Sequence, residues 1–340
     1  MPLGIHRGAV VVRIRRRSPD ARPVEPGHES SPALPTPLLN TPITASALER
    51  HGLSRFRAYA GDLRQLRRGI RCVPGAEPTP AQVAAVVAAQ AGHAVICGVT
   101  AAQLHGMRLP GTLSRSTLLH LARTDGRPRL RRPGVVGTEA AYRPEDVMMV
   151  GEVMVTTPAR TFLDLARMLN PVALVAVGDG LVCTHRHGIR AGVPPLCTVE
   201  QLRRMLDEHP GVRGVRRARL ALGRVRVGVD SPQETRMRLL LEDHRVGEWI
   251  TDHRLIGADG REVLPDLWDE YSRTSVQYEG MHHSDPRQVH RDVARERATR
   301  SVDAVEVRVV AADLDALAPY RGQLVPRVVA LVAAAVHRAR

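Results

Sequence analysis

The stretch from Ser231 to Glu279 constrains the fold of this chain more than any other part, because it joins a helix start to a run of strands. Ser231 followed by Pro232 is a typical N-cap and first helical residue, and the leucines at 239–241 supply the apolar side of the helix. Three strand-like segments follow, at 248–256, 262–269 and 273–279. The turn signal Ala-Asp-Gly at 258–260 separates the first two. This order predicts a domain of the α/β (α+β) class.

Acidic side chains fall at defined places on these elements. Glu234 lies in the first turn of the predicted helix, and Asp266 lies near the end of the second strand. Side chains alternate between the faces of a strand, so Gln277 and Glu279 on the third strand share one face. A tight loop between the two strands would place Asp266 opposite Val276 or Gln277. Clustered carboxylates hold the divalent metal that activates water for phosphodiester hydrolysis, so this spacing is compatible with a nuclease site.

A set of short motifs continues to Arg295. The motifs are Ser231-Pro232-Gln233-Glu234-Thr235, Pro265-Asp266, Val276-Gln277-Tyr278-Glu279-Gly280 with His283, and Asp292 with Arg295. In this order they resemble the DUF559 family, a relative of the very-short-patch-repair endonucleases in the PD-(D/E)xK superfamily. The resemblance covers about residues 231–315. It implies a restriction-endonuclease-like mixed sheet flanked by helices.

The resemblance also implies roles for individual residues. The catalytic set would be Glu234, Asp266, Gln277, Glu279, His283 and Arg295. Within it, Asp266, Gln277 and Glu279 would hold Mg²⁺ or Mn²⁺. His283 would serve as acid/base or phosphate contact, and Arg295 would support the site.

Two positions depart from the family pattern. Gln277 stands where the family has Glu, and Glu279 stands where it has Asp. A Gln offers a carbonyl oxygen but no charge, which lowers the expected affinity for a metal. The chain also contains no lysine, so the lysine usual in the wider superfamily has no counterpart.

The same residues have structural explanations. Asp266 follows a proline and could be a turn residue at the end of its strand. Glu234 could be a first-turn acid favoured by the helix dipole. His282 and His283 could be solvated loop residues.

The charge of the chain indicates an anionic partner. Its 340 residues carry a formal net charge of +14, and all 49 basic side chains are arginines. Such an excess is most simply explained by nucleic acid. Aromatic residues make up only 3% of the chain, which argues against a platform for stacking single-stranded bases.

Residues 43–76 predict a winged-helix DNA-binding domain. Thr44 starts one helix, His51-Gly52 ends it, Ser54–Leu66 forms a second helix, and 68–75 forms the closing strand. Six arginines lie between 55 and 71, against the single acid Asp62: Arg55, Arg57, Arg64, Arg67, Arg68 and Arg71. This bias is expected where a helix lies against a DNA backbone. A charged, solvated face is the alternative.

The following region carries further motifs. They are Gly98-Val99-Thr100-Ala101-Ala102-Gln103-Leu104-His105-Gly106, and Thr157-Pro158-Ala159-Arg160-Thr161 with Asp164. With the segment at 44–76, they resemble the type IV (abortive-infection) antitoxins over about residues 44–185. Cys72 replaces the family's wing tyrosine. Arg160 and Asp164 are four residues apart on a predicted helix, where an ion pair is the default expectation.

Length and composition suggest the remaining boundaries. We expect a Pro-rich tail at 1–42, a mixed α/β middle region at 77–226, the endonuclease-like domain at 231–318 and a C-terminal helix at 319–340. A second basic stretch, 213–226, could steer DNA. Four scattered cysteines without a C-x-x-C pair favour a reducing, cytoplasmic setting. No apolar run reaches membrane-spanning length.

These observations lead to a main hypothesis and two alternatives. The main hypothesis is a DNA-binding protein with a Mg²⁺-dependent endonuclease domain. The first alternative is a non-catalytic DNA-binding antitoxin or regulator with a degenerate nuclease fold, which Gln277 favours. The second is an antitoxin that acts by contacting its toxin. DNA is the expected partner, with a toxin, a repair protein or a second copy of the chain as further candidates.

Overall fold

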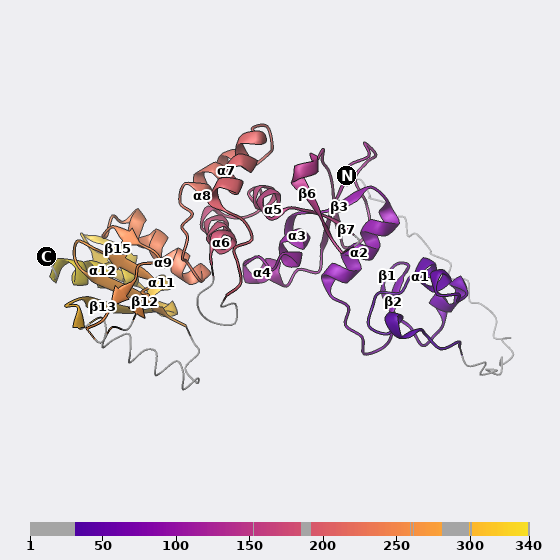
Figure 1. The fold of residues 1–340 in the computed structure, drawn as a ribbon, viewed down its shortest axis with the longest axis horizontal. Helices are drawn as coiled ribbons and strands as arrows, with labels where there is room; N and C mark the ends of the chain where they lie inside the picture. The colour runs from indigo at the N-terminus through magenta and orange to yellow at the C-terminus, as the bar shows by residue number, and fades with distance from the viewer. Residues whose placement is uncertain are drawn as a thin grey trace, which may run out of the picture. The chain divides into compact units, whose positions relative to one another are not determined.

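The computed structural model describes most of the chain after residue 30 (Figure 1). The described residues are 31–151, 153–184, 192–258, 260, 262–280, 299 and 301–338. They divide into two compact units, and residues 43–75 form the body of the first. In the second unit we distinguish a middle region (residues 76–229) and a C-terminal domain (residues 230–338).

The first unit is small and ends in a β-hairpin. Its elements are η1 (Thr36–Leu38), α1 (Ala45–Arg50), η2 (Arg55–Tyr59), β1 (Arg64–Arg67) and β2 (Ile70–Cys72). Thr44 caps α1 by accepting the amide of Ala47 at 3.1 Å. Ile43 and Leu48 are fully buried in the core that these elements share.

The helix expected over Ser54–Leu66 is replaced by the short turn η2 and strand β1. Ala60 ends η2 in an extended conformation, with φ −63° and ψ 145°. Beyond it, Arg64 pairs with Cys72 in an antiparallel ladder, which requires extended backbone where the helix was expected. The expected second helix was therefore wrong, while α1 and strand β2, which lies within the expected closing strand at 68–75, agree with the prediction.

A five-stranded mixed sheet is the base of the middle region. Its strand order is β5-β4-β3-β7-β6, with β3 (Ala94–Ile96), β4 (Leu119–Arg123), β5 (Val135–Glu139), β6 (Val147–Val150) and β7 (Val153–Thr156). Helices α2 (Pro80–Ala91) and α3 (Gly98–Leu104) pack on the strands. Short helices α4 (Gly111–Ser114) and η3 (Pro144–Asp146) lie in its connections.

A helical layer completes the middle region. It contains α5 (Pro158–Leu165), α6 (Pro171–Val182), α7 (Val199–Glu208) and α8 (Val215–Leu222). These helices share one apolar core, in which Phe162, Leu174 and Leu202 are fully buried. The predicted helix that carries Arg160 and Asp164 is confirmed as α5. Thr157 caps it, and Thr198 caps α7 in the same way.

The C-terminal domain has the predicted helix followed by strands. Helix α9 (Pro232–Asp243) precedes a sheet of order β13-β12-β11-β8, with β8 (Trp249–Ile250), β11 (Leu267–Asp269), β12 (Thr274–Glu279) and β13 (Val305–Val310). Strands β9 (Leu255–Ile256) and β10 (Glu262–Val263) form a separate hairpin. Helix α11 (Ala311–Asp315), the hairpin β14 (Leu317–Tyr320) and β15 (Gln323–Pro326), and α12 (Arg327–Arg338) follow.

The strand expected at 248–256 is broken into β8 and β9. Asp252 adopts a left-handed φ of +63° between them, which interrupts extended pairing. The segment 262–269 is also divided into two strands, β10 and β11. Pro265 lies between them and has no backbone N–H to donate to a neighbouring strand.

Helix α12 belongs to the core of the C-terminal domain. Val328, Val329 and Val332 are fully buried with Met237 of α9 and Val276 of β12. The helix therefore packs within this domain, past the boundary at residue 318 that the sequence suggested. It begins at Arg327 and not at 319, because β14 and β15 occupy 317–326. The α+β class is confirmed for the chain.

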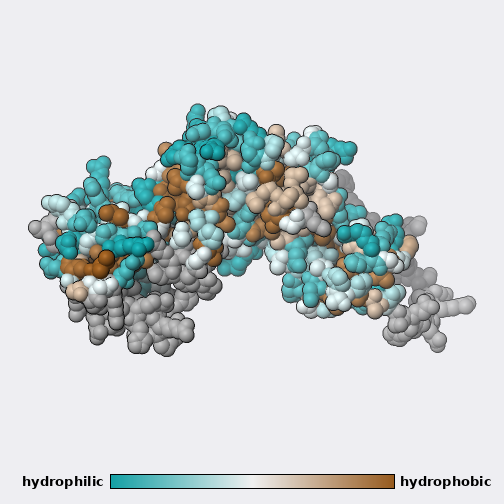
Figure 2. All heavy atoms as spheres, viewed as in Figure 1, coloured by the Kyte–Doolittle hydropathy of each residue, from teal (hydrophilic) through white to brown (hydrophobic). Residues whose placement is uncertain are grey.

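None of the described helices is long and apolar enough to cross a bilayer. On the face drawn in Figure 2, hydrophilic residues predominate and apolar residues reach the surface in separate patches.

Candidate functional site

Strands β11 and β12 bring Asp266 and Gln277 together. Leu267 pairs with Val276, which places the preceding Asp266 beside Gln277, as the sequence predicts. The amide nitrogen of Gln277 donates to one Asp266 carboxylate oxygen at 2.7 Å, and the backbone N–H of Tyr278 donates to the other at 2.7 Å. Glu279 is half-buried at the end of β12, opposite Val310 of β13.

This arrangement differs from a pair of metal-binding carboxylates. Gln277 turns its amide nitrogen toward Asp266, and its buried oxygen has no hydrogen-bond partner among the described residues. A Gln satisfies the Asp266 carboxylate directly, whereas a Glu there would set two negative charges side by side unless a cation or a proton intervened. Within the described residues, no three His, Cys, Asp or Glu side chains are grouped to hold a metal. His283, Asp292 and Arg295 lie outside the described residues, so the Mg²⁺ site stays a prediction.

Glu234 has a structural partner at the junction between α6 and α9. Its carboxylate accepts the backbone N–H of Asp230 at 2.7 Å, and its own N–H donates to Ser231 Oγ at 3.1 Å. The thiol of Cys183, at the end of α6, donates to Asp230 at 3.2 Å. Burial, reinforced by the Asp230 charge, raises the pKa of Glu234 to about 7.

The raised pKa of Glu234 predicts a pH-dependent stability. The ordinary pKa of a glutamate is 4.5, and the folded pKa of Glu234 lies above it. Its protonation therefore adds fully to the free energy of unfolding below about pH 4.5, and this addition is lost as the pH rises to about 7. We expect Glu234→Gln to remove this part of the pH dependence, because the amide oxygen can still accept the Asp230 N–H. Urea unfolding followed by tryptophan fluorescence at several pH values would measure it. Parallel curves for the variant and the wild type would contradict the assignment.

A buried ion pair at the same junction ties α9 to the middle region. Asp179 of α6 accepts three hydrogen bonds: from Arg238 at 2.9 Å, from the Thr235 hydroxyl at 2.7 Å and from the Arg226 backbone at 2.8 Å. Asp179 and Arg238 are at most 1% exposed. Thr235 of the Ser-Pro-x-Glu-Thr motif thus serves the junction and does not face the Asp266 pair.

The arginines of the first unit divide into two groups. Arg57 is buried, with its guanidinium paired to Asp62 through bonds of 2.8 and 2.7 Å and its Nε donating to Pro32 O at 2.9 Å. Arg57 is therefore occupied within the fold and unavailable to a phosphate. The other five are on η2 or the hairpin: Arg55, Arg64, Arg67, Arg68 and Arg71.

Two exposed aromatic side chains accompany these arginines. Phe56 is 75% and Tyr59 67% exposed on η2, and the Arg71 guanidinium lies 5.6 Å from the centre of the Tyr59 ring. Neither aromatic residue was a candidate from the sequence, although one signal was present. Phe56 is one of only two phenylalanines in the chain and is flanked by arginines.

A second buried network lies under the start of α5. The guanidinium of Arg160 donates to Asp146 at 2.7 Å and to Asp164 at 3.2 Å, and lies 4.5 Å from the centre of the Tyr142 ring. His209 contacts the Asp146 carboxylate at 3.0 Å. The expected Arg160–Asp164 pair is present, but Asp146 is the shorter contact and lies far from it in sequence.

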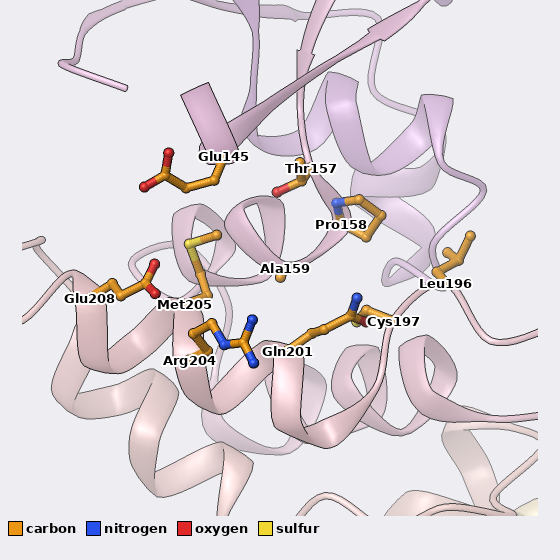
Figure 3. Close-up of a pocket in the computed structure, with 10 residues that line it drawn as sticks. All are labelled: Glu145, Thr157, Pro158, Ala159, Leu196, Cys197, Gln201, Arg204, Met205 and Glu208. Carbon is orange, nitrogen blue, oxygen red and sulfur yellow. The ribbon is translucent and has the colours of Figure 1, made fainter. Parts of the chain in front are cut away.

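A pocket of about 330 Å³ opens beside this network (Figure 3). Glu145 and Thr157 border it from η3 and the start of α5, and Gln201, Arg204 and Glu208 line it from α7. Figure 3 shows these polar side chains around an opening with Met205 and Ala159 between them. The lining offers charges of both signs beside apolar side chains, a combination typical of binding sites.

The comparison with protein families concerns the region that contains this pocket. The family described as the AbiEi antitoxin C-terminal domain matches residues 94–222. The match supports the antitoxin resemblance and includes both the Arg160 network and the pocket. No curated protein and no solved structure matches the chain.

Proposed function

We propose that this chain is a DNA-binding regulator of the antitoxin type, with a toxin protein as its second partner. The similarity of residues 94–222 to the AbiEi antitoxin C-terminal domain carries the proposal. In the C-terminal domain we propose a nuclease-like fold of the DUF559 kind that acts as a scaffold and does not cleave DNA.

The hairpin of the first unit is the proposed DNA contact. A major groove admits a helix or a two-stranded ribbon, and η2 spans only Arg55–Tyr59, which is too short to fill the groove. The turn of the hairpin, Arg68-Gly69, is exposed, and Gly69 has a φ of +75° that suits a tight turn. Arginines at this tip and along β1 can place guanidinium groups on successive phosphates.

The Asp266–Gln277 pair supports a scaffold role. Its hydrogen bonds satisfy the Asp266 carboxylate with neutral donors, so the pair is stable without a cation. Glu234 contributes to the junction with α6 and not to a group with Asp266. Of the three acids in the predicted catalytic set, Asp266 and Glu279 then remain at strands β11 and β12.

Gel retardation of a DNA duplex tests the DNA contact. We expect wild-type protein to bind with strong salt dependence, because arginine–phosphate contacts release counterions. Replacing Arg64, Arg67 and Arg68 together with glutamine should weaken binding more than about tenfold and lower the salt slope by about 3. Binding that is unchanged in this variant would exclude the hairpin as the contact.

The same preparations distinguish a regulator from a nuclease. Supercoiled plasmid is incubated with wild-type protein and the Asp266→Asn variant, in Mg²⁺, in Mn²⁺ and in EDTA. We expect retardation by both proteins and nicking by neither. Metal-dependent nicking that the variant lacks would overturn the scaffold role and restore the endonuclease hypothesis.

A further inference from the structure

The connection between β4 and β5 forms an arginine-rich surface that the sequence analysis did not single out. These strands are parallel neighbours, and residues 124–134 join them without a helix. Four arginines of this loop are exposed: Arg127, Arg129, Arg131 and Arg132. Arg129, Arg131 and Arg132 border a shallow concavity of about 600 Å³ at the edge strand β5.

The loop is held in a defined position. Its backbone crosses Gly137 so closely that a Cβ there would lie 2.2 Å from the carbonyl oxygen of Leu130. Glu139 accepts the backbone N–H of Arg129 at 2.9 Å, and Val135 donates to the carbonyl of Arg132 at 3.0 Å. A side chain at Gly137 would therefore displace the loop without changing its charge.

The acids near the loop are already occupied. Asp125 pairs with Arg123 and lies 3.8 Å from Arg127, and Glu139 accepts the loop backbone. The Arg129 and Arg131 guanidinium groups make no hydrogen bond or ion pair to any other described residue, and Arg132 reaches only the Gln90 side chain, at 3.4 Å. The loop carries more positive than negative charge and presents it from a fixed backbone.

We propose that this loop (Arg127–Arg132) is a second contact for the phosphate backbone of double-stranded DNA, separate from the hairpin of the first unit. The inference rests on the proposed DNA-binding function. Guanidinium forks match phosphate oxygens in geometry and charge, and the loop contains no aromatic residue that would stack on single-stranded bases. Each phosphate that the loop contacts would add to the salt-dependent part of the affinity for DNA.

The test compares two variants that lose the same charge. The loop variant carries Arg129, Arg131 and Arg132→Gln. The control carries Arg245, Arg321 and Arg338→Gln, three exposed arginines of the C-terminal domain. The affinity of each full-length protein for a long mixed-sequence DNA duplex is measured over a series of salt concentrations. We expect the loop variant to bind more than about tenfold more weakly, with a salt slope lower by about 3, and the control to change far less.

A third variant separates position from charge. Gly137→Val keeps every arginine but displaces the loop, so we expect DNA affinity to fall although the net charge is unchanged. Circular dichroism would confirm that both loop variants are folded.

The outcomes distinguish this inference from the proposed function. If wild-type protein binds no DNA, both fail. If the hairpin variant weakens binding but both loop variants bind like wild type, only the second contact is refuted. Normal DNA binding by the loop variant together with lost binding to an acidic partner protein would likewise overturn it and assign the loop to that protein.

Discussion

Replacing Asp179 with alanine is expected to destabilise the C-terminal domain by about 3–5 kcal/mol, the usual cost of removing one partner of a buried ion pair. Arg238 is fully buried and would lose the carboxylate that lies 2.9 Å away, keeping only its pair with the partly exposed Glu242 at 2.7 Å. The Thr235 hydroxyl and the Arg226 amide would lose their acceptor as well. Urea unfolding followed by fluorescence measures the loss, because both tryptophans of the chain, Trp249 and Trp268, lie in this domain.

Two further variants test the reason for the effect. Asp315 of α11 pairs with Arg236 of α9 at 2.7 Å, but both side chains are exposed. Asp315→Ala should therefore change stability little. A double variant with Asp179→Leu and Arg238→Met removes both charges and should be more stable than Asp179→Ala alone. If Asp179→Ala costs no more than Asp315→Ala, the buried pair does not hold the junction.

Replacing Arg160 with leucine is expected to destabilise the middle region by a similar amount, about 3–5 kcal/mol. Asp146 and Asp164 would remain buried with no guanidinium between them. Burial already raises the pKa of Asp164, and removal of Arg160 would raise it further. A carboxyl with a raised folded pKa favours the fold when protonated, so the loss should be smaller at about pH 5 than at about pH 8.

Circular dichroism during urea unfolding measures this effect. Arg203→Leu is the matched control, because Arg203 forms a 2.6 Å pair with Glu200 at the surface and should cost within about 1 kcal/mol. A loss for Arg160→Leu that is equally large at both pH values would show that shape, and not charge, accounts for it.

The local pattern of the sequence predicted some of these features correctly. Ser231-Pro232 marked the start of α9, and strand alternation brought Asp266 to Gln277. The helix start depends on adjacent residues, and the Asp266–Gln277 contact depends on a short hairpin. Both are local features that helix-capping and strand-register rules describe well.

Hydrogen bonds and strand pairings that no periodicity of the sequence encodes account for what the sequence did not predict. The direction of Glu234 is set by Asp230 and α6, and the burial of Arg57 by Pro32 and Asp62. Propensity over 54–66 favoured a helix, but pairing with β2 made part of it a strand. The basic loop was missed because its significance lies in the close passage over Gly137, which no periodicity reveals.

The shared core of α9 and α12 has a consequence for synthesis on the ribosome. Met237 and Leu241 of α9 pack with Val328 and Val332 of α12, and residues 244–326 must be translated before that partner exists. Asp179 and the apolar core that receives Leu239 of α9 are by then already translated, so the first partner available to the nascent α9 is the middle region. The middle region, folding first, would hold α9 in place while the remainder of its domain is translated.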